Sequence, residues 1–130
     1  KKNKVQIIFE SDYHPKKLGS FIKKFNKKYF GINYDTGNSA SLNYNMKDEF
    51  KYFGNRILNI HIKDRKKFGN TVRLGEGNAN FNQLFINLKK INYKGNLILQ
   101  TARSKINKHV EEIKINLKFL KKIQNEIKQT

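Results

Sequence analysis

The sequence predicts an α/β fold in which four strand–helix units form part of a β/α barrel. Short apolar segments alternate four times with segments whose apolar residues recur at helical spacing. Each apolar segment ends on a residue that can bind a metal ion: Glu10, Asp35, His61 and Gln100. In β/α barrels the chemistry lies at the carboxyl ends of the strands, where side chains from several strands converge.

The first two units are expected at residues 5–10 and 30–35 for the strands. Between these strands, apolar residues recur at helical spacing at Leu18, Phe21, Ile22 and Phe25. The second strand leads into a loop rich in Gly, Asn and Ser, and then into a short helix over residues 46–53. The pattern therefore predicts strand, helix, strand, loop and helix.

The third strand is expected at residues 57–64, and a long loop follows at 65–77. Asn78 is a candidate N-cap for the next helix, whose apolar face carries Phe81, Leu84, Phe85 and Leu88. The fourth strand is expected at 96–101. The last helix is predicted from apolar residues close to the 3.6-residue period: Ile106, Val110, Ile113, Leu117, Leu120 and Ile127.

With 130 residues, the chain is long enough for one domain spanning 1–130 but too short for a complete eight-fold barrel, which needs roughly 200 residues or more. Four units would leave two open parallel sheet edges, which are normally covered or closed. The chain also lacks an initiator Met and enters a strand almost at once. We therefore expect that it begins within a longer protein and that the N-terminal half of the barrel is missing.

Several classes of protein are excluded or disfavoured by composition. The chain has no cysteine, so it has neither disulfides nor a thiolate zinc site. No segment approaches the roughly 18 apolar residues of a membrane span, and the apolar run in KKNKVQIIFE is too short for a signal peptide. We therefore expect no membrane partner and a cytoplasmic location. The formal charge of +18 would suit nucleic acid, but the lysines are scattered in pairs along predicted helices. We therefore interpret them as solvated helix faces and do not expect nucleic acid as a partner.

Three segments carry a family resemblance: GINYDTGNSA at 31–40, IHIKDR at 60–65 and GEGN at 75–78. With them the chain resembles the sugar phosphate isomerase/epimerase family of the xylose-isomerase-like TIM-barrel superfamily. The resemblance implies a partial TIM barrel, with the four units corresponding to strands five to eight of a (β/α)8 barrel. It also implies one divalent ion, held between a Glu, an Asp, a His and a second Glu.

Carried over to this sequence, the resemblance makes Glu10, Asp35 and His61 metal ligands, with Gln100 at the position of the second glutamate. Asn38 also departs from the family, because many members have a His there. The resemblance implies manganese first, with magnesium, cobalt or zinc as alternatives, and carboxylate and imidazole ligands suit such ions. The ion would act as a Lewis acid on a sugar carbonyl and stabilise an enediolate, while Glu10 serves as ligand and as catalytic base.

The loss of the second carboxylate bears on the reaction type. Inversion of a carbon usually needs two bases, whereas a 1,2-shift between aldose and ketose can run with one. Gln100 cannot take a proton, so the sequence favours isomerisation, or a changed or lost activity, unless Glu76 or the absent half supplies the second base. A sugar or sugar phosphate is the expected small-molecule partner. Its contacts are predicted at Asp64 and at three arginines, whose guanidinium groups fit phosphate: Arg65, Arg73 and Arg103.

Simpler interpretations remain open for most of these residues. Glu10 and Asp35 could be turn residues at strand ends, and His61 a hydrogen-bonded core residue. Asp64 could cap a loop, and Gly75-Glu76-Gly77 is more typical of a tight turn than of a phosphate cradle. We expect His14 and His109 at the surface. Two other functions stay possible: an endonuclease IV-type phosphodiesterase, which would need more histidines, and a non-catalytic basic α/β binding module.

Overall fold

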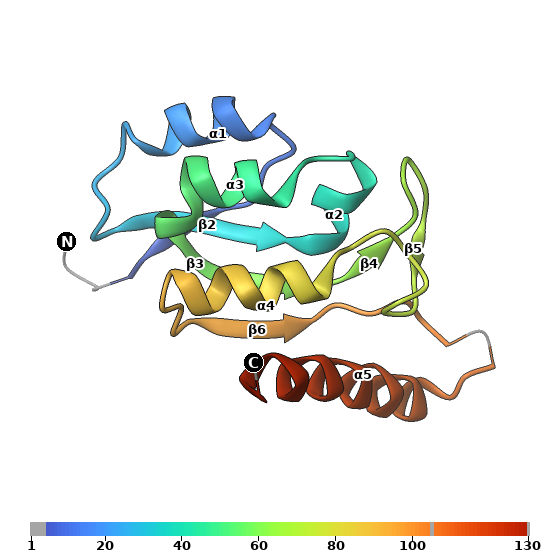
Figure 1. Cartoon of the computed structure of the whole chain (residues 1–130). Helices are drawn as coiled ribbons and strands as arrows, with labels where there is room; N and C mark the ends of the chain where they lie inside the picture. The colour runs from blue at the N-terminus through green and yellow to red at the C-terminus, as the bar shows by residue number, and fades with distance from the viewer. Residues whose placement is uncertain (1–4, 105, 130) are drawn as a thin grey trace.

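The computed structural model describes residues 5–104 and 106–129. Strands β1 (Ile7–Phe9), β2 (Phe30–Asp35), β3 (Ile57–Ile62) and β6 (Asn96–Leu99) form one sheet in the order β1-β2-β3-β6 (Figure 1). Every pairing in this sheet is parallel. The predicted α/β fold with a parallel sheet of strand–helix units is therefore confirmed.

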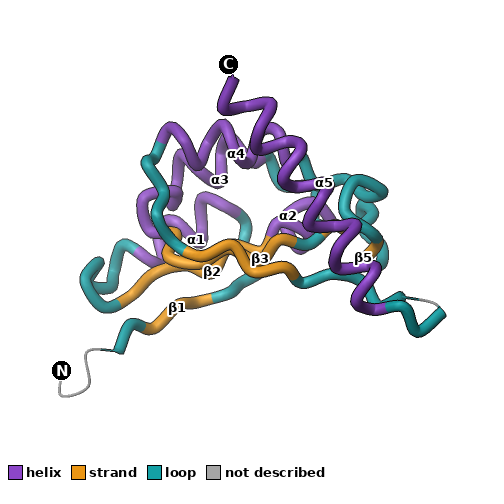
Figure 2. The backbone as a smooth tube through the Cα atoms, turned by 90° about the horizontal axis from the view of Figure 1, so that it is seen from below, coloured by secondary structure: helices purple, strands orange, loops and turns teal. Residues whose placement is uncertain are grey.

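Helices follow each strand of the sheet, and the first three lead to the next strand. Helix α1 (Pro15–Ile22) follows β1, α3 (Met46–Phe53) follows β2, α4 (Phe81–Lys90) follows β3, and α5 (His109–Gln129) follows β6. Figure 2 shows α1, α3 and α4 on the same side of the sheet. The core between these layers includes the buried side chains of Leu18, Ile22, Ile32, Tyr34, Ile60, Ile62 and Leu84. No helix among the described residues is both long and apolar enough to cross a membrane.

The register of the parallel strands decides which side chains share the other face of the sheet. Asp35 is paired with His61, and Asn33 with Asn59. Because side chains alternate along a strand, Asn33 and Asp35 lie on the face opposite the buried Tyr34. The polar residues of the strand ends are therefore separated by the sheet from the apolar core.

The loop predicted after β2 contains a further helix, α2 (Thr36–Ser41). Asp35 is its N-cap, and its Oδ1 accepts a hydrogen bond of 2.8 Å from the backbone N–H of Asn38. Small polar residues favour turns and caps over helix interiors, so the sequence TGNSAS does not predict a helix. The aspartate cap satisfies one of the free N–H groups of its first turn.

Other boundaries differ from the prediction. The predicted third strand ends at Ile62, and a small antiparallel hairpin follows, β4 (Asp64–Arg65) with β5 (Thr71–Val72), most of it in the predicted loop at 65–77. The N-cap of α4 is Asn80, whose Oδ1 accepts from the backbone N–H of Gln83, and not the predicted Asn78. Asn78 instead accepts a hydrogen bond from the backbone of Lys67. The predicted last helix begins only at His109, so Ile106 lies before it and is exposed.

Asp64 organises the loop between this hairpin and α4. Its side chain is fully buried and accepts hydrogen bonds from the backbone N–H groups of Gly75, Gly77 and Ala79, each at 2.9 Å. Gly75 has a φ of +90°, which suits glycine. Of the two roles that the sequence left open for Asp64, the structure shows the loop cap. The two glycine donors are used by this carboxylate, as expected of a tight turn.

Replacing Asp64 with Asn should destabilise the protein strongly. The amide would present N–H donors where the loop already presents N–H donors, leaving at least one buried group unsatisfied. We expect a loss of at least about 2 kcal/mol in the free energy of unfolding, measured by urea denaturation. The matched control is Asp48→Asn, at an exposed site in α3, which should change the free energy by a few tenths of that. Equal effects of the two substitutions would contradict the role of Asp64.

Candidate metal centre

Three acidic or imidazole side chains meet at the carboxyl ends of neighbouring strands. Glu10 directly follows β1, Asp35 ends β2 and His61 lies near the end of β3. One donor atom from each of the three lies within 4.8 Å of the others. The closest recorded approach between two of them is 3.3 Å, from Glu10 Oε2 to His61 Nδ1. The structure thus brings together three of the four predicted ligands.

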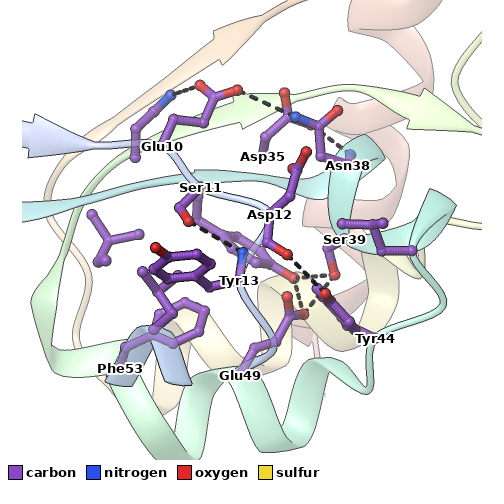
Figure 3. Close-up of a pocket in the computed structure, with 15 residues that line it drawn as sticks. Glu10, Ser11, Asp12, Tyr13, Asp35, Asn38, Ser39, Tyr44, Glu49 and Phe53 are labelled. Carbon is purple, nitrogen blue, oxygen red and sulfur yellow. Dashed lines mark hydrogen bonds between the residues drawn. The ribbon is translucent and has the colours of Figure 1, made fainter. Parts of the chain in front are cut away.

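Glu10 is held in this cluster by amide side chains. Asn33 Nδ2 donates to Glu10 Oε2 at 2.6 Å and lies 3.1 Å from His61 Nδ1. Asn59 Nδ2 in turn donates to Asn33 Oδ1 at 2.7 Å. On the other side, Asn38 Nδ2 donates to Glu10 Oε1 at 3.3 Å (Figure 3). Amide donors from two elements therefore fix the carboxylate of an otherwise exposed glutamate next to the histidine.

Asp35 has two roles at once. Its Oδ1 caps α2, which is the turn function that the sequence left open. Its Oδ2 lies 2.7 Å from the ammonium group of Lys63, which follows β3. The Asp35 side chain is only 2% exposed, so its charge is compensated inside the protein and not by solvent.

Gln100, the fourth predicted ligand, lies at the same end of the sheet. It directly follows β6, and its backbone N–H donates to the carbonyl oxygen of Ile62 at 2.9 Å. This bond keeps the chain beside β3 one residue beyond the end of β6. Its side chain is exposed, and its participation in a metal site stays a prediction.

The predicted substrate-binding arginines lie in different surroundings. Arg65 donates through Nε and Nη2 to the carbonyl oxygen of Gly69, and through Nη1 to Asn38 Oδ1 at 3.1 Å. Arg73 instead forms a bidentate pair with Glu112 of α5, at 2.6 and 2.8 Å. Arg103 is exposed in the segment after β6. Arg65 is thus connected to Glu10 through Asn38, whereas the guanidinium of Arg73 is engaged by a carboxylate of the protein.

A pocket of about 20 Å³ adjoins the cluster, with room for one water molecule (Figure 3). Its wall includes Glu10 and Asp35 on one side and Glu49 of α3 on the other. Glu49 is 3% exposed, and its Oε2 accepts hydrogen bonds from Tyr34 at 2.7 Å and from Ser39 at 2.6 Å. Burial raises the pKa of the Glu49 carboxyl above its ordinary value, and the two hydroxyl donors offset part of this effect.

Two residues of the cluster escaped the sequence-based prediction. Asn33 precedes Asp35 by two positions, and Lys63 follows His61 by two. In a strand this spacing puts side chains on the same face, so the alternation around each predicted ligand was the available signal. The other two histidines, His14 and His109, are both exposed, as expected.

Known proteins share the sequence pattern and the fold of this chain. The chain matches the model of a protein family described as xylose isomerase-like TIM barrel over residues 2–123. A putative L-ribulose-5-phosphate 3-epimerase of Haemophilus influenzae is 30% identical over 95 residues, which are 68% of this chain and 33% of that protein. The crystal structure of a xylose isomerase domain protein from Planctomyces limnophilus superimposes with a TM-score of 0.81 at 20% identity. This match covers 96% of this chain and 49% of that one.

A second solved structure is of a xylose isomerase-like TIM-barrel protein from Mycobacterium smegmatis in complex with magnesium. It superimposes with a TM-score of 0.66 at 19% identity and covers 92% of this chain and 45% of its own. The chain thus spans about half the length of these solved structures and about a third of the curated relatives, 29% and 33%. These matches confirm the predicted partial TIM barrel and the family resemblance.

The pKa of Glu49 makes a prediction for stability. A carboxyl whose pKa is raised on folding stabilises the protein below its unfolded value, near 4.5, and this contribution is lost as the pH rises through the folded value. Glu49→Gln keeps an oxygen that can accept from Tyr34 and Ser39 but removes the buried charge. We expect the variant to gain stability relative to wild type as the pH rises from mildly acidic to neutral.

Urea denaturation of both proteins across this pH range measures the difference. Glu111→Gln, at an exposed site in the first turn of α5, is the matched control and should follow the wild type. If the free energies of unfolding of Glu49→Gln and wild type differ by the same amount at every pH, the raised pKa of Glu49 is contradicted.

Proposed function

The chain belongs to the xylose isomerase-like TIM-barrel family, and we propose that its strand-end cluster takes part in isomerising or epimerising a sugar or sugar phosphate. The observation that carries this proposal is the convergence of Glu10, Asp35 and His61 from three strands, with donor atoms within 4.8 Å of one another. In β/α barrels this end of the strands is where catalytic groups gather.

The donor set fits a divalent ion. Two carboxylates and an imidazole match the preferences of manganese, magnesium, cobalt and zinc, and their mutual distances suit one ion contacting all three. Gln100 at the end of β6 would add a carbonyl oxygen. When bound, such an ion polarises a sugar carbonyl and favours loss of the proton on the neighbouring carbon.

The residues of this chain would then handle the proton. Glu10 is the proposed base: it removes a proton from the carbon next to the carbonyl, and the electron pair moves into the carbonyl to give an enediolate. Asn33 and Asn38 hold the Glu10 carboxylate through hydrogen bonds of 2.6 and 3.3 Å. Return of this proton by Glu10 to the former carbonyl carbon on the same face gives isomerisation. Epimerisation needs a second group that delivers a proton to the opposite face of the first carbon, a role that Gln100 cannot fill.

The site has too few histidines for a phosphodiesterase with several metal ions. Such enzymes use clusters rich in histidine, whereas among the described residues the cluster contains His61 alone, with His14 and His109 exposed at the starts of α1 and α5. The positive net charge of the chain would suit a nucleic-acid substrate, but it does not replace the missing histidine ligands. We therefore retain the sugar chemistry as the proposed function.

Deuterium exchange tests the proposal directly. The protein is incubated with Mn²⁺ in D₂O with L-ribulose 5-phosphate, the substrate named for the Haemophilus relative, or with an unphosphorylated ketose. Nuclear magnetic resonance should detect deuterium at carbon 3 for epimerisation or at carbon 1 for isomerisation. The Glu10→Gln variant should lose this exchange, because an amide cannot take the proton. Equal exchange in both proteins would overturn the role of Glu10.

His61→Ala should weaken the binding of Mn²⁺. Loss of a direct ligand should cost more than the roughly 10–100-fold typical of losing an outer partner. Isothermal titration calorimetry measures the affinity, and circular dichroism checks that the variant is folded. His109→Ala removes an exposed histidine at the start of α5 and serves as the control. If His61→Ala and His109→Ala bind Mn²⁺ equally, the ligand assignment fails.

Gln100→Glu should tighten the binding of Mn²⁺. A third carboxylate adds attraction for a dication, and about 1.4 kcal/mol of additional attraction corresponds to a tenfold gain in affinity. We expect at least about this gain by calorimetry. Asn82→Asp, at an exposed site in α4, adds the same charge away from the cluster and should leave the affinity near that of the wild type. An unchanged affinity of Gln100→Glu would exclude residue 100 from the metal site.

A further inference from the structure

A buried ion pair joins the aspartate of the cluster to a lysine that the proposed chemistry does not use. Lys63 Nζ lies 2.7 Å from Asp35 Oδ2, and the two side chains are only 13% and 2% exposed. At such low exposure the attraction between the charges is screened less than at the surface. The pair is therefore a substantial part of the electrostatics around Asp35.

Lys63 is held in place by α2 as well as by its charge. Its backbone N–H donates to Thr36 Oγ1 at 2.9 Å, and the same hydroxyl donates to the carbonyl oxygen of Lys63 at 2.6 Å. A Cβ atom at Gly37 would lie 2.7 Å from Lys63 Cγ, so the lysine stem packs directly on the backbone of this glycine. The ammonium group is thus directed to Asp35 by a fixed backbone and a packed stem.

The pair changes the charge that the cluster offers to a cation. Glu10 and Asp35 together carry two negative charges, and Lys63 compensates one of them. Asp35 Oδ1 accepts from Asn38 N–H, whereas the buried Oδ2 has no hydrogen-bond partner and is balanced by the charge of the lysine at 2.7 Å. A divalent ion that uses Asp35 must therefore share this carboxylate with an ammonium group, which repels the ion.

We propose that Lys63 is an internal counter-cation that holds Asp35 in the absence of a divalent ion and lowers the affinity of the site for that ion. The inference rests on the proposed metal site. It assigns to Lys63 the role of setting the affinity of that site for the ion. Lys63 is a positioning residue in this role, because it acts through Asp35. The consequence is a site that binds its ion weakly and exchanges it readily.

A purely structural ion pair would behave in the opposite way. If Lys63 only kept Asp35 in position, its removal would disorganise the carboxylate and weaken metal binding. If Lys63 opposes the ion, its removal strengthens binding while it destabilises the metal-free protein, because a buried carboxylate is left without a counter-charge. The sign of the change in affinity therefore separates the two roles.

The test is the affinity of Mn²⁺ for the wild type and for Lys63→Met, measured from the electron paramagnetic resonance signal of free Mn²⁺. We expect binding at least about tenfold tighter in the variant. Thermal unfolding should show a lower melting temperature for the metal-free variant and a larger rise on adding Mn²⁺ than in wild type. Lys63→Gln, which keeps a donor for Asp35, is a second neutral variant and should shift the affinity in the same direction.

Lys66→Met is the matched control, because it removes one positive charge from an exposed site in the neighbouring hairpin. It should leave the affinity near that of the wild type, which separates a local effect from the general charge of +18. Equal or weaker binding by both Lys63 variants, with Mn²⁺ bound by the wild type, would overturn the role of Lys63 alone. No binding by any of these proteins would overturn the metal site as well.

Discussion

The parallel register between β2 and β3 is the constraint on which the candidate site depends. It sets Asp35 beside His61, and the pairing of Phe9 with Ile32 brings the following Glu10 beside Asn33. A shift of a single residue in either pairing would turn the polar side chains toward the helices, because strand side chains alternate between faces. The buried apolar residues between them, such as Tyr34 and Ile60, resist this shift. The core therefore fixes the geometry of the cluster on the opposite face.

The polar partners of the cluster divide the task of holding two carboxylates together. Two like charges a few ångströms apart repel, and Asp35 is also largely removed from water. Asn33 and Asn38 supply hydrogen bonds to Glu10 without adding charge, whereas Lys63 supplies a full positive charge to Asp35. The arrangement leaves Glu10 as the more exposed and less compensated carboxylate, which suits a group proposed to exchange protons with a substrate.

The sequence predicts much of this fold because its apolar periodicity agrees with the core in α4, where all four predicted apolar residues are buried. In α5 the agreement is poorer, because Val110, Ile113 and Leu117 are exposed. The bounds of β2 and α3 coincide with their predicted ranges, and the strand ends point to Glu10, Asp35 and His61. The structure shows α2 in addition, because the capping aspartate stabilises a segment whose residues favour turns. Likewise, the hairpin of β4 and β5 is too short for a periodic signal and is held by contacts such as those of Asp64.

Lys63 could not be singled out from sequence for a different reason. Among 28 lysines and arginines, one more lysine carries no signal, and only its distance to Asp35 distinguishes it. Arg73, by contrast, is predicted from its loop position to contact the substrate. In the structure its guanidinium is paired with Glu112, which is distant in the sequence. The periodicity of a sequence does not predict which side chains from remote segments pair with each other.

The most direct test of the site is a crystal of the protein soaked in Mn²⁺ and measured at the manganese absorption edge. We expect one anomalous peak at bonding distance from carboxylate oxygens of Glu10 and Asp35 and from a ring nitrogen of His61. Manganese bound elsewhere, or a cluster that remains free of it with Lys63 still on Asp35, would contradict the assignment of this strand-end cluster as a metal centre.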